Sequence, residues 1–447
     1  MPSFVKTAKV LAKLGGVPDL RIVVYPGAIN NDSDTEVAEK IEKEVMNQIV
    51  DAFTKPGDES QYVQSKSAPR AEPGKPVFEG SIDEVNKFFW EQGWTDGLPV
   101  IPPTTQKVEE YLEYTDLSPD QEIAVLPQAN FIATPRNIAS NAIMAGCPPQ
   151  FMPLLIAAVE AVADPEYQLL NIGSTICMVP WLLVNGPIIK QLGIEYEIGL
   201  ASRGPNPVIG RAFQLILRNI AGFKPGETLM GVWGYFSPFV MAENEDRCYD
   251  IGWKPYHVER GFDKSTSTVT IRTTCNWGFQ VVRARGSTAE PILKWISKQA
   301  GRIISAEIAP AWGSRNMVTV LITPPTAKVI ARDGYSKRDV AEYVWENTTV
   351  PKHELVITPP SFSLVSDKED VLFKSLDKFA GEITEGLSKL PERFEKAGPD
   401  DLIPLLATAS PDVIDVVVCG DTWRDKAMNF WSCYNRPVTK EIRPFKK

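Results

Sequence analysis

The sequence has few of the residues and motifs that usually reveal catalysis. Its 447 residues include only two histidines, and none of its six cysteines forms a Cys-x-x-Cys pair. This spacing argues against a disulfide framework, a zinc ribbon and a self-contained dithiol. We also find no Gly-x-Gly-x-x-Gly, P-loop, Gly-x-Ser-x-Gly or His-Glu-x-x-His motif. We therefore expect no nucleotide cofactor, and common hydrolase and zincin chemistries are disfavoured.

Long hydrophobic runs and an excess of positive charge are absent as well. No stretch approaches the ~18 apolar residues of a membrane-spanning helix. The net charge of -9 provides no basic surface for nucleic acid or an anionic membrane. We expect a cytoplasmic protein with a small-molecule substrate or a protein partner, and with no nucleic-acid or membrane partner. At 43% hydrophobic residues, the chain can bury the cores of two or three domains.

Residues 1–55 predict a fragment of a doubly wound parallel α/β sheet. The pattern indicates a helix at 4–14, a buried strand at 20–25 and a second helix at 34–53. Apolar residues recur every fourth position along the second helix, at Val37, Ile41, Val45, Ile49 and Phe53. One apolar strand needs neighbours on both edges. We therefore expect a partner chain to complete this fragment.

The rest of the chain predicts a larger α/β body with a mixed sheet. Residues 56–80 are rich in Pro, Gly and charge, which is typical of a linker or strap. The body is expected to consist of a first segment, residues 81–265, and a second segment, residues 266–447. The expected helices are 81–90, 105–114, 136–144, 152–163, 206–222, 290–300 and 337–346, with a short one opening at 420–421. The expected strands are 98–101, 268–273, 317–323 and 413–419. Residues 100–108 and 322–329 share a faint Pro-Pro-Thr and Lys-Val echo.

The sharpest local signal surrounds His257, which lies in an aromatic and charged loop shortly after Glu243 and Glu245. A neutral imidazole beside carboxylates can bind a divalent metal or act as a general base. Glu243, Glu245 and His257 are therefore candidate metal ligands, and His257 and Glu259 are candidate catalytic residues. A divalent metal ion is the one cofactor that the sequence leaves open. The alternative is a structural histidine beside a solvated Glu259–Arg260 pair.

Two further residues are catalytic candidates. Cys147 lies between two expected helices, where helix-terminal N–H groups lower a thiol pKa. The alternative is a plain buried cysteine. Asp96 and the neighbouring Trp94 occupy a tight turn, a usual place for a pocket lip, with Trp94 as a substrate-binding residue. The alternative is an ordinary turn with Trp94 as a core residue.

Four more residues are candidates for binding a substrate. Arg136 and Arg211 can clamp a carboxylate bidentately, or each can pair with an acid on its own helix. Arg260 lies beside the candidate catalytic residues. Asn185, which precedes Gly-Pro, can present an amide to an oxyanion or simply begin a turn. The second histidine, His353, lies in a polar turn and is expected to be exposed.

Several segments of this chain together resemble one bacterial family. It is the family found with the UGSC selenoprotein or thiol domain, which is similar to the catalytic subunits of glycine, betaine and proline reductases. Residues 16–27 also resemble the last strand of the UGSC domain itself. The segments of the main body that carry the resemblance lie in order at 93–104, 141–148, 185–187, 209–212, 242–245, 257–262 and 333–337.

This resemblance implies a thiol- or selenol-dependent reductase that cleaves a carbon–heteroatom bond of a small molecule. The domain half with the Sec/Cys-Gly-Ser-Cys motif is missing from this chain. We therefore expect a separate small subunit to carry that motif and a hetero-oligomer to form. Two alternatives stay open: a metal-dependent lyase or hydrolase that uses His257 and nearby carboxylates, and a noncatalytic stabilising subunit.

Overall fold

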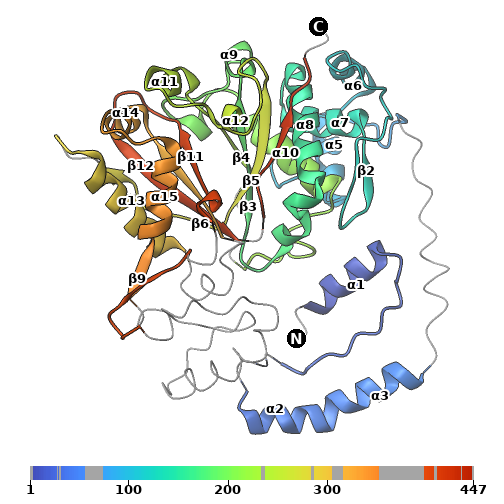
Figure 1. Ribbon diagram of the computed structural model, residues 1–447. Coiled ribbons are helices and arrows are strands. Elements are labelled where there is room, and N and C mark those ends of the chain that lie inside the picture. The colour runs from blue at the N-terminus through green and yellow to red at the C-terminus, as the bar shows by residue number, and fades with distance from the viewer. Residues whose placement is uncertain are drawn as a thin grey trace.

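The main body has the α/β architecture with mixed sheets that the sequence predicts (Figure 1). The computed structural model describes residues 4–27, 29, 32–55, 74–232, 237–282, 286–304, 316–351, 397–406, 410–433 and 435–444. His353 and most of the predicted linker lie outside these residues. Within the described ranges, no helix is long and apolar enough to cross a membrane.

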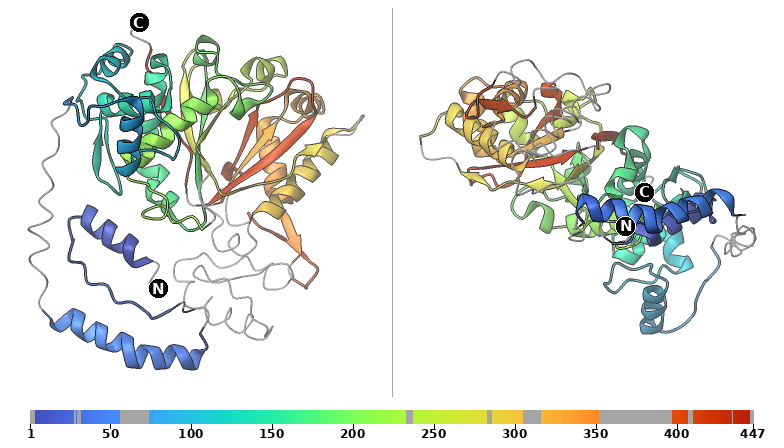
Figure 2. Two further views of the ribbon diagram at one scale, coloured as in Figure 1. Left: turned by 180° about the vertical axis from the view of Figure 1, so that it is seen from behind. Right: turned by 90° about the horizontal axis from the view of Figure 1, so that it is seen from below.

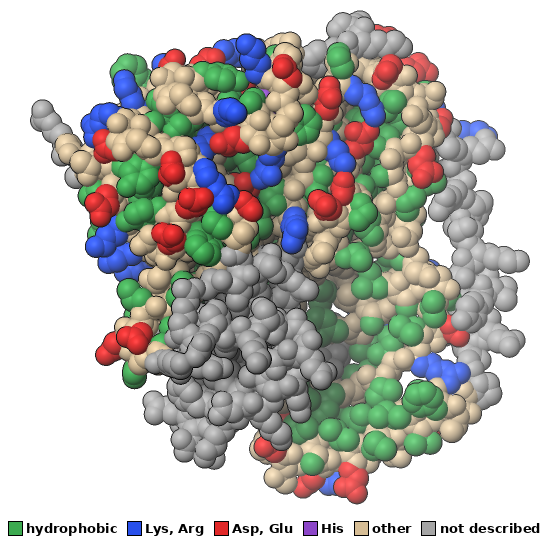
Figure 3. Space-filling view, in the orientation of Figure 1, with side chains coloured by type: hydrophobic (Ala, Val, Ile, Leu, Met, Phe, Trp, Pro, Cys, Tyr) green, Lys and Arg blue, Asp and Glu red, His purple; other side chains and the backbone are tan. Residues whose placement is uncertain are grey.

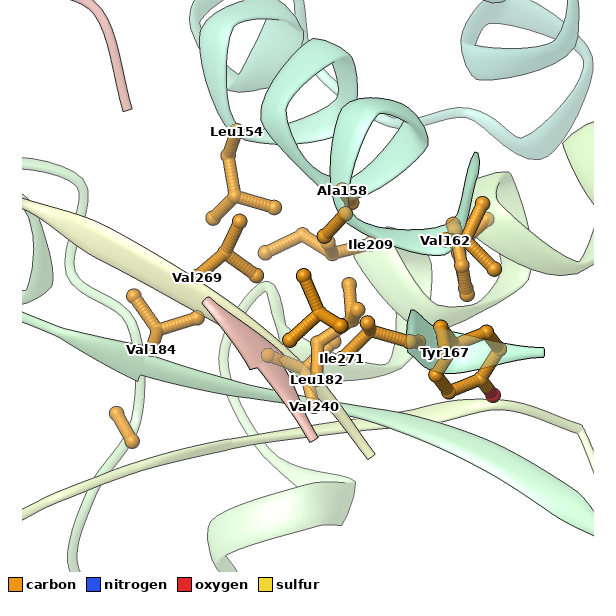
Figure 4. Packing of buried hydrophobic residues seen from close by; sticks show 14 of the residues in the cluster. Leu154, Ala158, Val162, Tyr167, Leu182, Val184, Ile209, Val240, Val269 and Ile271 are labelled. Atoms are coloured by element: carbon orange, nitrogen blue, oxygen red, sulfur yellow. The ribbon is translucent and has the colours of Figure 1, made fainter. Parts of the chain in front are cut away.

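The first sheet has four strands in the order β13 (Val438–Glu441), β5 (Thr268–Thr274), β3 (Val179–Asn185) and β4 (Phe239–Ala242). β3 runs parallel to β4 and antiparallel to β5. Helices α8 (Met152–Ala163) and α10 (Asn206–Asn219) cover its outer face. Figure 4 shows Leu154, Ala158 and Val162 of α8 packed against apolar side chains of these strands. Every residue of β3 and β5 is buried, which explains their continuous apolar and β-branched sequences.

The second sheet has the order β11 (Ile414–Val418), β8 (Asn316–Ile322), β12 (Lys426–Cys433) and β6 (Asn276–Trp277), and β7 (Val281–Val282) also pairs with β12. β8 runs parallel to β11 and antiparallel to β12. Helices α13 (Ala289–Ile303) and α15 (Lys337–Asn347) pack on its outer face. The two sheets face each other, so the body has four layers in the order α, β, β, α (Figure 2).

The two halves of the body repeat one topology. In each half a helix (α8 or α13) precedes a strand (β3 or β8), a second helix (α10 or α15) leads to a parallel neighbour (β4 or β11), and an antiparallel strand (β5 or β12) follows. The first helix packs on the antiparallel strand and the second on the parallel neighbour in both halves. The faint echo between 100–108 and 322–329 does not mark this repeat, because residues 100–104 lie in no strand.

Equivalent rows of side chains meet between the sheets. In each sheet, three residues at partner positions on neighbouring strands form a row. These residues are Phe239, Trp181 and Arg272 in the first sheet and Asp415, Thr319 and Phe430 in the second. Arg272 donates hydrogen bonds to Thr319 Oγ1 at 2.6 Å and Asp415 Oδ2 at 2.7 Å, while the rings of Phe430 and Trp181 meet edge to face. A buried ion pair and an aromatic contact therefore join the two halves.

Shorter elements complete the body. The helices are α5 (Ile82–Glu91), α6 (Thr105–Leu112), α7 (Pro135–Ala145), α9 (Ile188–Gln191), α11 (Glu245–Asp250), α12 (Tyr256–Glu259) and α14 (Pro324–Arg332). The remaining strands form two small antiparallel pairs, β1 (Ala124–Leu126) with β2 (Phe131–Ala133), and β9 (Thr349–Pro351) with β10 (Leu402–Pro404). β5 and β13 lie in the second predicted segment, residues 266–447, but they belong to the same sheet as β3 and β4 of the first predicted segment. The two predicted segments therefore share a sheet.

Two predicted elements of the body are wrong. Residues 98–101 form no strand, because Pro99 lacks an N–H and the backbone N–H groups of Val100 and Ile101 bond to Asn86 and Met144 instead. Residues 420–421 open a turn that leads into β12, not a helix. The other helices and strands predicted within the body are confirmed to within about three residues at each end.

The N-terminal arm, residues 4–54, contains the two predicted helices. They are α1 (Val5–Leu14) and a continuous helix formed by α2 (Asp34–Lys40), a π-helical turn (Ile41–Val45) and α3 (Met46–Thr54), which starts with a Ser33–Glu36 capping box. The strand predicted at 20–25 is not formed. Instead, the side-chain amide of Gln48 bonds to both the N–H and the C=O of Val24 at 2.9 Å. The segment is therefore extended but pairs with no strand among the described residues.

The ion pair between the sheets provides a test of the fold. We expect Asp415→Asn to destabilise the protein by roughly 3–5 kcal/mol, because it leaves the charge of the buried Arg272 without its partner. Glu342→Gln removes an exposed pair with Arg338 and should cost no more than about 0.5 kcal/mol. Denaturant titration measures both free energies of unfolding. Equal small losses in the two variants would mean that the pair does not join the sheets.

Candidate functional site

The candidate site lies at the carboxyl ends of β3 and β4. Because these strands are parallel, Asn185 at the end of β3 and Glu243 just after β4 meet at one edge of the sheet. The backbone N–H of Asn244 donates to the carbonyl of Val418 at the end of β11, at 2.7 Å. Strand ends from both sheets therefore converge on Glu243.

Glu243 is the centre of a buried polar network. Its side chain is fully buried, and its carboxylate accepts hydrogen bonds from Lys337 Nζ (2.8 Å), Asn185 Nδ2 (2.8 Å) and the N–H of Tyr256 (2.6 Å). Burial opposes the charge on Lys337, but the carboxylates of Glu243 and Glu259 raise its pKa above the ordinary value. Lys337 is therefore a cation that neutralises Glu243 inside the protein.

Glu245 is the second carboxylate of the network. Its Oε1 accepts hydrogen bonds from Gly186 N (2.6 Å) and Asn185 Nδ2 (2.9 Å) and lies 3.4 Å from His257 Nδ1. Burial raises the pKa of this carboxyl, and these hydrogen bonds only partly offset the effect. Unlike Glu243, Glu245 has no lysine or arginine partner within salt-bridge distance among the described residues. A carboxyl with a raised pKa and no such cationic partner is the group of this network best suited to proton transfer.

His257 is fully buried behind these carboxylates. Burial lowers its pKa, and the opposing effect of Glu243 is smaller, so the imidazole is neutral. Neither ring nitrogen makes a well-formed hydrogen bond, although the backbone of Lys264 and Asp263 is close enough to raise the pKa. His257 thus contacts Glu245 but does not line the pocket described next, so it is placed to position Glu245.

A pocket of about 240 Å³ opens beside Glu245. Its volume suits a small metabolite, since sites for drug-sized ligands are larger, at about 300–1,000 Å³. Lys190 and Asp246 form an exposed ion pair at 2.7 Å at its rim. The polar and aromatic side chains that line it are Lys190, Tyr196, Glu243, Asn244, Glu245, Asp246 and Tyr249.

A second charged network adjoins the first through Lys337. Glu259 lies 3.4 Å from Lys337, and burial raises the pKa of its carboxyl. Arg260 donates to Asp415 at 2.6 Å and stacks over the ring of Tyr256. The alternative of a solvated Glu259–Arg260 pair is therefore wrong, because each of the two pairs with a different, more buried partner. Arg260 is engaged within the protein and is not a free substrate clamp.

Four predicted site residues lie in the helical part of the body and contribute to its packing. Asp96 and Arg211 form a bidentate ion pair with N–O distances of 2.8 and 3.0 Å, and Arg211 also donates to Pro99 O. Trp94 packs edge-on against the aromatic rings of Phe88 and Phe89. Arg136 forms a bidentate pair with Asp120 at 2.7 and 2.8 Å. The structural alternatives account for Asp96 and Trp94, whereas Arg211 and Arg136 each pair with an acid that lies outside their own helix.

Cys147 is not a reactive thiolate. Its side chain is completely buried, and burial raises the pKa of the thiol far above its usual range. The prediction that helix ends lower this pKa is wrong, because the lost hydration of the charged form outweighs any dipole.

The described residues contain no group of three or more His, Cys, Asp or Glu side chains arranged to hold a metal ion. Glu243, Glu245 and His257 are close together, yet the carboxylate of Glu243 is neutralised by Lys337 and His257 is fully buried. This donor set does not fit a metal centre.

Sequence reasoning missed several residues of these networks, among them Asp415 and Lys337. Asp415 interrupts an otherwise apolar strand, and a buried acid requires a partner, so the sequence contained a usable signal for it. Lys337 begins α15 directly after its Ser336 cap and carries no such signal. A search with this chain finds no matching family model, no curated protein and no solved structure.

The buried histidine provides a test by pH. A histidine whose pKa is lowered on folding is protonated first in the unfolded chain, so it destabilises the protein as pH falls below about 6.5. We expect His257→Asn to lose this component of the pH dependence, whereas His353→Asn, at the predicted exposed histidine, should keep it. Free energies of unfolding between about pH 5 and 8 measure the difference. Identical slopes in His257→Asn and the unmodified protein would contradict a buried neutral imidazole.

Proposed function

We propose that this chain is a subunit of a heteromeric enzyme, whose N-terminal arm binds a partner chain and whose pocket binds a small molecule. The observation that carries the proposal is the apolar surface of the arm. Among the helices of the arm, only Thr7 is buried. Figure 3 shows hydrophobic side chains gathered over the arm. The large hydrophobic residues that the arm exposes are Phe4, Leu11, Val17, Leu20, Val23, Ile41, Met46, Val50 and Phe53.

The form of the arm favours one kind of occupant. Its extended segment at 20–24 has no strand neighbour among the described residues, and both Leu20 and Val23 are exposed. A chain with the remaining strands of an α/β sheet would pair with this segment and cover the helices on either side. The resemblance of residues 16–27 to the end of a UGSC domain supports the same occupant, a small subunit that supplies the missing half.

The arm attaches to the edge of the body where β3 begins. Thr7 Oγ1 bonds to Met230 Sδ at 3.1 Å, Lys6 lies 3.5 Å from Glu227, and Met230 N donates to Gly173 O shortly before β3. The pocket lies at the other end of β3, which at seven residues spans ~20 Å. A partner on the arm would therefore approach the edge opposite the pocket.

The reaction class of this proposal is a thiol- or selenol-dependent reduction of a small molecule. It rests on the resemblance to UGSC-type reductases and on a pocket that holds an acid with a raised pKa. The metal-dependent lyase or hydrolase is less supported, because Lys337 already neutralises Glu243. The Glu245→Gln experiment below distinguishes an enzymatic subunit from one that only stabilises its partner.

The exposed apolar surface of the arm predicts that polar substitutions there prevent the hetero-oligomer from forming. Phe53 is 85% exposed, and we expect Phe53→Ser with Val50→Ser to abolish the hetero-oligomer, because both side chains would be buried against the partner. Native mass spectrometry of the chain co-expressed with the product of its neighbouring gene measures the assembly. Trp423→Ser, at an equally exposed aromatic residue of the body, is the matched control. A monomer before substitution, or an assembly that survives it, would overturn the proposal.

A substitution in the pocket is expected to lower turnover while the hetero-oligomer still forms. Glu245→Gln keeps the hydrogen bond from Gly186 but cannot take up or release a proton. We expect it to lower kcat of the assembled enzyme by roughly 10²–10⁴-fold. Asp250→Asn, which removes an exposed pair with Arg247 on the same helix, should leave kcat unchanged. Full activity of Glu245→Gln would instead indicate a stabilising subunit.

A further inference from the structure

The fold brings together two cysteines that are 158 residues apart in the sequence. Cys275 lies between β5 and β6, and Cys433 ends β12, and their Sγ atoms are 3.8 Å apart. The absence of a Cys-x-x-Cys pair argued against a self-contained dithiol. That exclusion is wrong, because neighbouring strands place the two thiols in contact.

The backbone around the two thiols is well anchored. The N–H of Cys275 donates to the carbonyl of Trp431 at 2.7 Å, and Thr274 Oγ1 donates to the same oxygen at 3.2 Å. β6 then pairs with β12 at Asn276 and Trp431. Cys275 and Cys433 therefore lie on hydrogen-bonded segments of chain that hold the two sulfur atoms close together.

The two thiols differ in charge and exposure. The contact with the Cys433 thiol lowers the pKa of Cys275, against the effect of burial, and the same contact together with burial raises the pKa of Cys433. Cys275 is partly exposed, while Cys433 is completely buried. Cys275 is thus the thiol of the pair that ionises more readily and is the less buried of the two.

We propose that Cys275 and Cys433 form a dithiol–disulfide site that exchanges two electrons with a disulfide of another molecule. The Cys275 thiolate attacks one sulfur of that disulfide, which forms a mixed disulfide and releases one thiolate. The released thiolate takes the proton of Cys433, and the Cys433 sulfur then attacks Cys275 and releases the second thiolate. The second thiolate takes a proton from water, which replaces the proton that Cys275 lost on ionising. The incoming disulfide is thereby reduced to two thiols, and Cys275 and Cys433 are oxidised to one disulfide.

The site lies at the edge of the body to which the arm attaches. Met230, which contacts α1, donates a backbone hydrogen bond to Gly173, and Cys177 follows shortly afterwards in the chain. Cys177 lies close enough to Cys275 that negative charge on Cys275 raises the pKa of Cys177, in addition to the effect of burial. Phe279, which follows Cys275 in the chain, is 93% exposed. A disulfide or selenenyl sulfide on the partner chain would reach this edge. This choice of partner rests on the proposed function, whereas the exchange itself does not.

The exchange is tested on the full chain alone, with oxidised glutathione as the probe. We expect two of the six thiols to be lost and peptide mapping to find a Cys275–Cys433 disulfide. Cys433→Ser should instead retain glutathione on Cys275, because the second attack cannot occur. Cys147→Ala, at a buried and isolated thiol, should behave like the unmodified chain. Six remaining thiols, or a disulfide between other cysteines, would overturn the proposal.

A second measurement needs no substitution. Cys177 and Cys275 are both partly exposed, but the pKa of Cys177 is raised and that of Cys275 is lowered. Iodoacetamide should therefore alkylate Cys275 faster at neutral pH, by roughly tenfold for each unit between the two pKa values. Equal rates at neutral pH, or a faster Cys177, would overturn the site. Native mass spectrometry tests the heteromeric proposal separately, so the two failures are distinguishable.

Discussion

The ion pair between Glu243 and Lys337 is the interaction on which the candidate site depends. It joins the end of β4 in one half of the body to the first turn of α15 in the other. Two buried charges are tolerated only when each has a partner and its remaining hydrogen bonds are satisfied. Asn185 and the N–H of Tyr256 supply those bonds, which in turn fix the end of β3 and the start of α12.

The same principle explains how the two halves are held in register. A row of apolar and aromatic side chains would allow the two sheets to slide, but Arg272 must meet Asp415 and Thr319. The buried charges thus fix which positions of the two sheets face each other. The pocket beside Glu245 follows from this, because its walls come from the first half while the charge that balances Glu243 comes from the second.

The two edges of the body have different chemistry. One edge carries carboxylates, a neutral histidine and a small pocket, and the other carries the contact between Cys275 and Cys433 and the attachment of the arm. β3 runs from one edge to the other. The proposed acid–base site and the proposed thiol site therefore lie at opposite ends of the same strand.

The sequence by itself determined the elements whose signals are local. Helix α8 and strand β5 were predictable because each is apolar or β-branched over nearly its whole length, and α2 because Ser33 and Glu36 form its cap. His257, Glu243 and Glu245 were also recognisable, since they lie close together in the chain. Only the tertiary structure decided their roles, because burial and distant partners set their charges. Lys337 lies 94 residues from Glu243, and Cys433 lies 158 residues from Cys275. No local pattern records such contacts, since they exist only once the strands have paired.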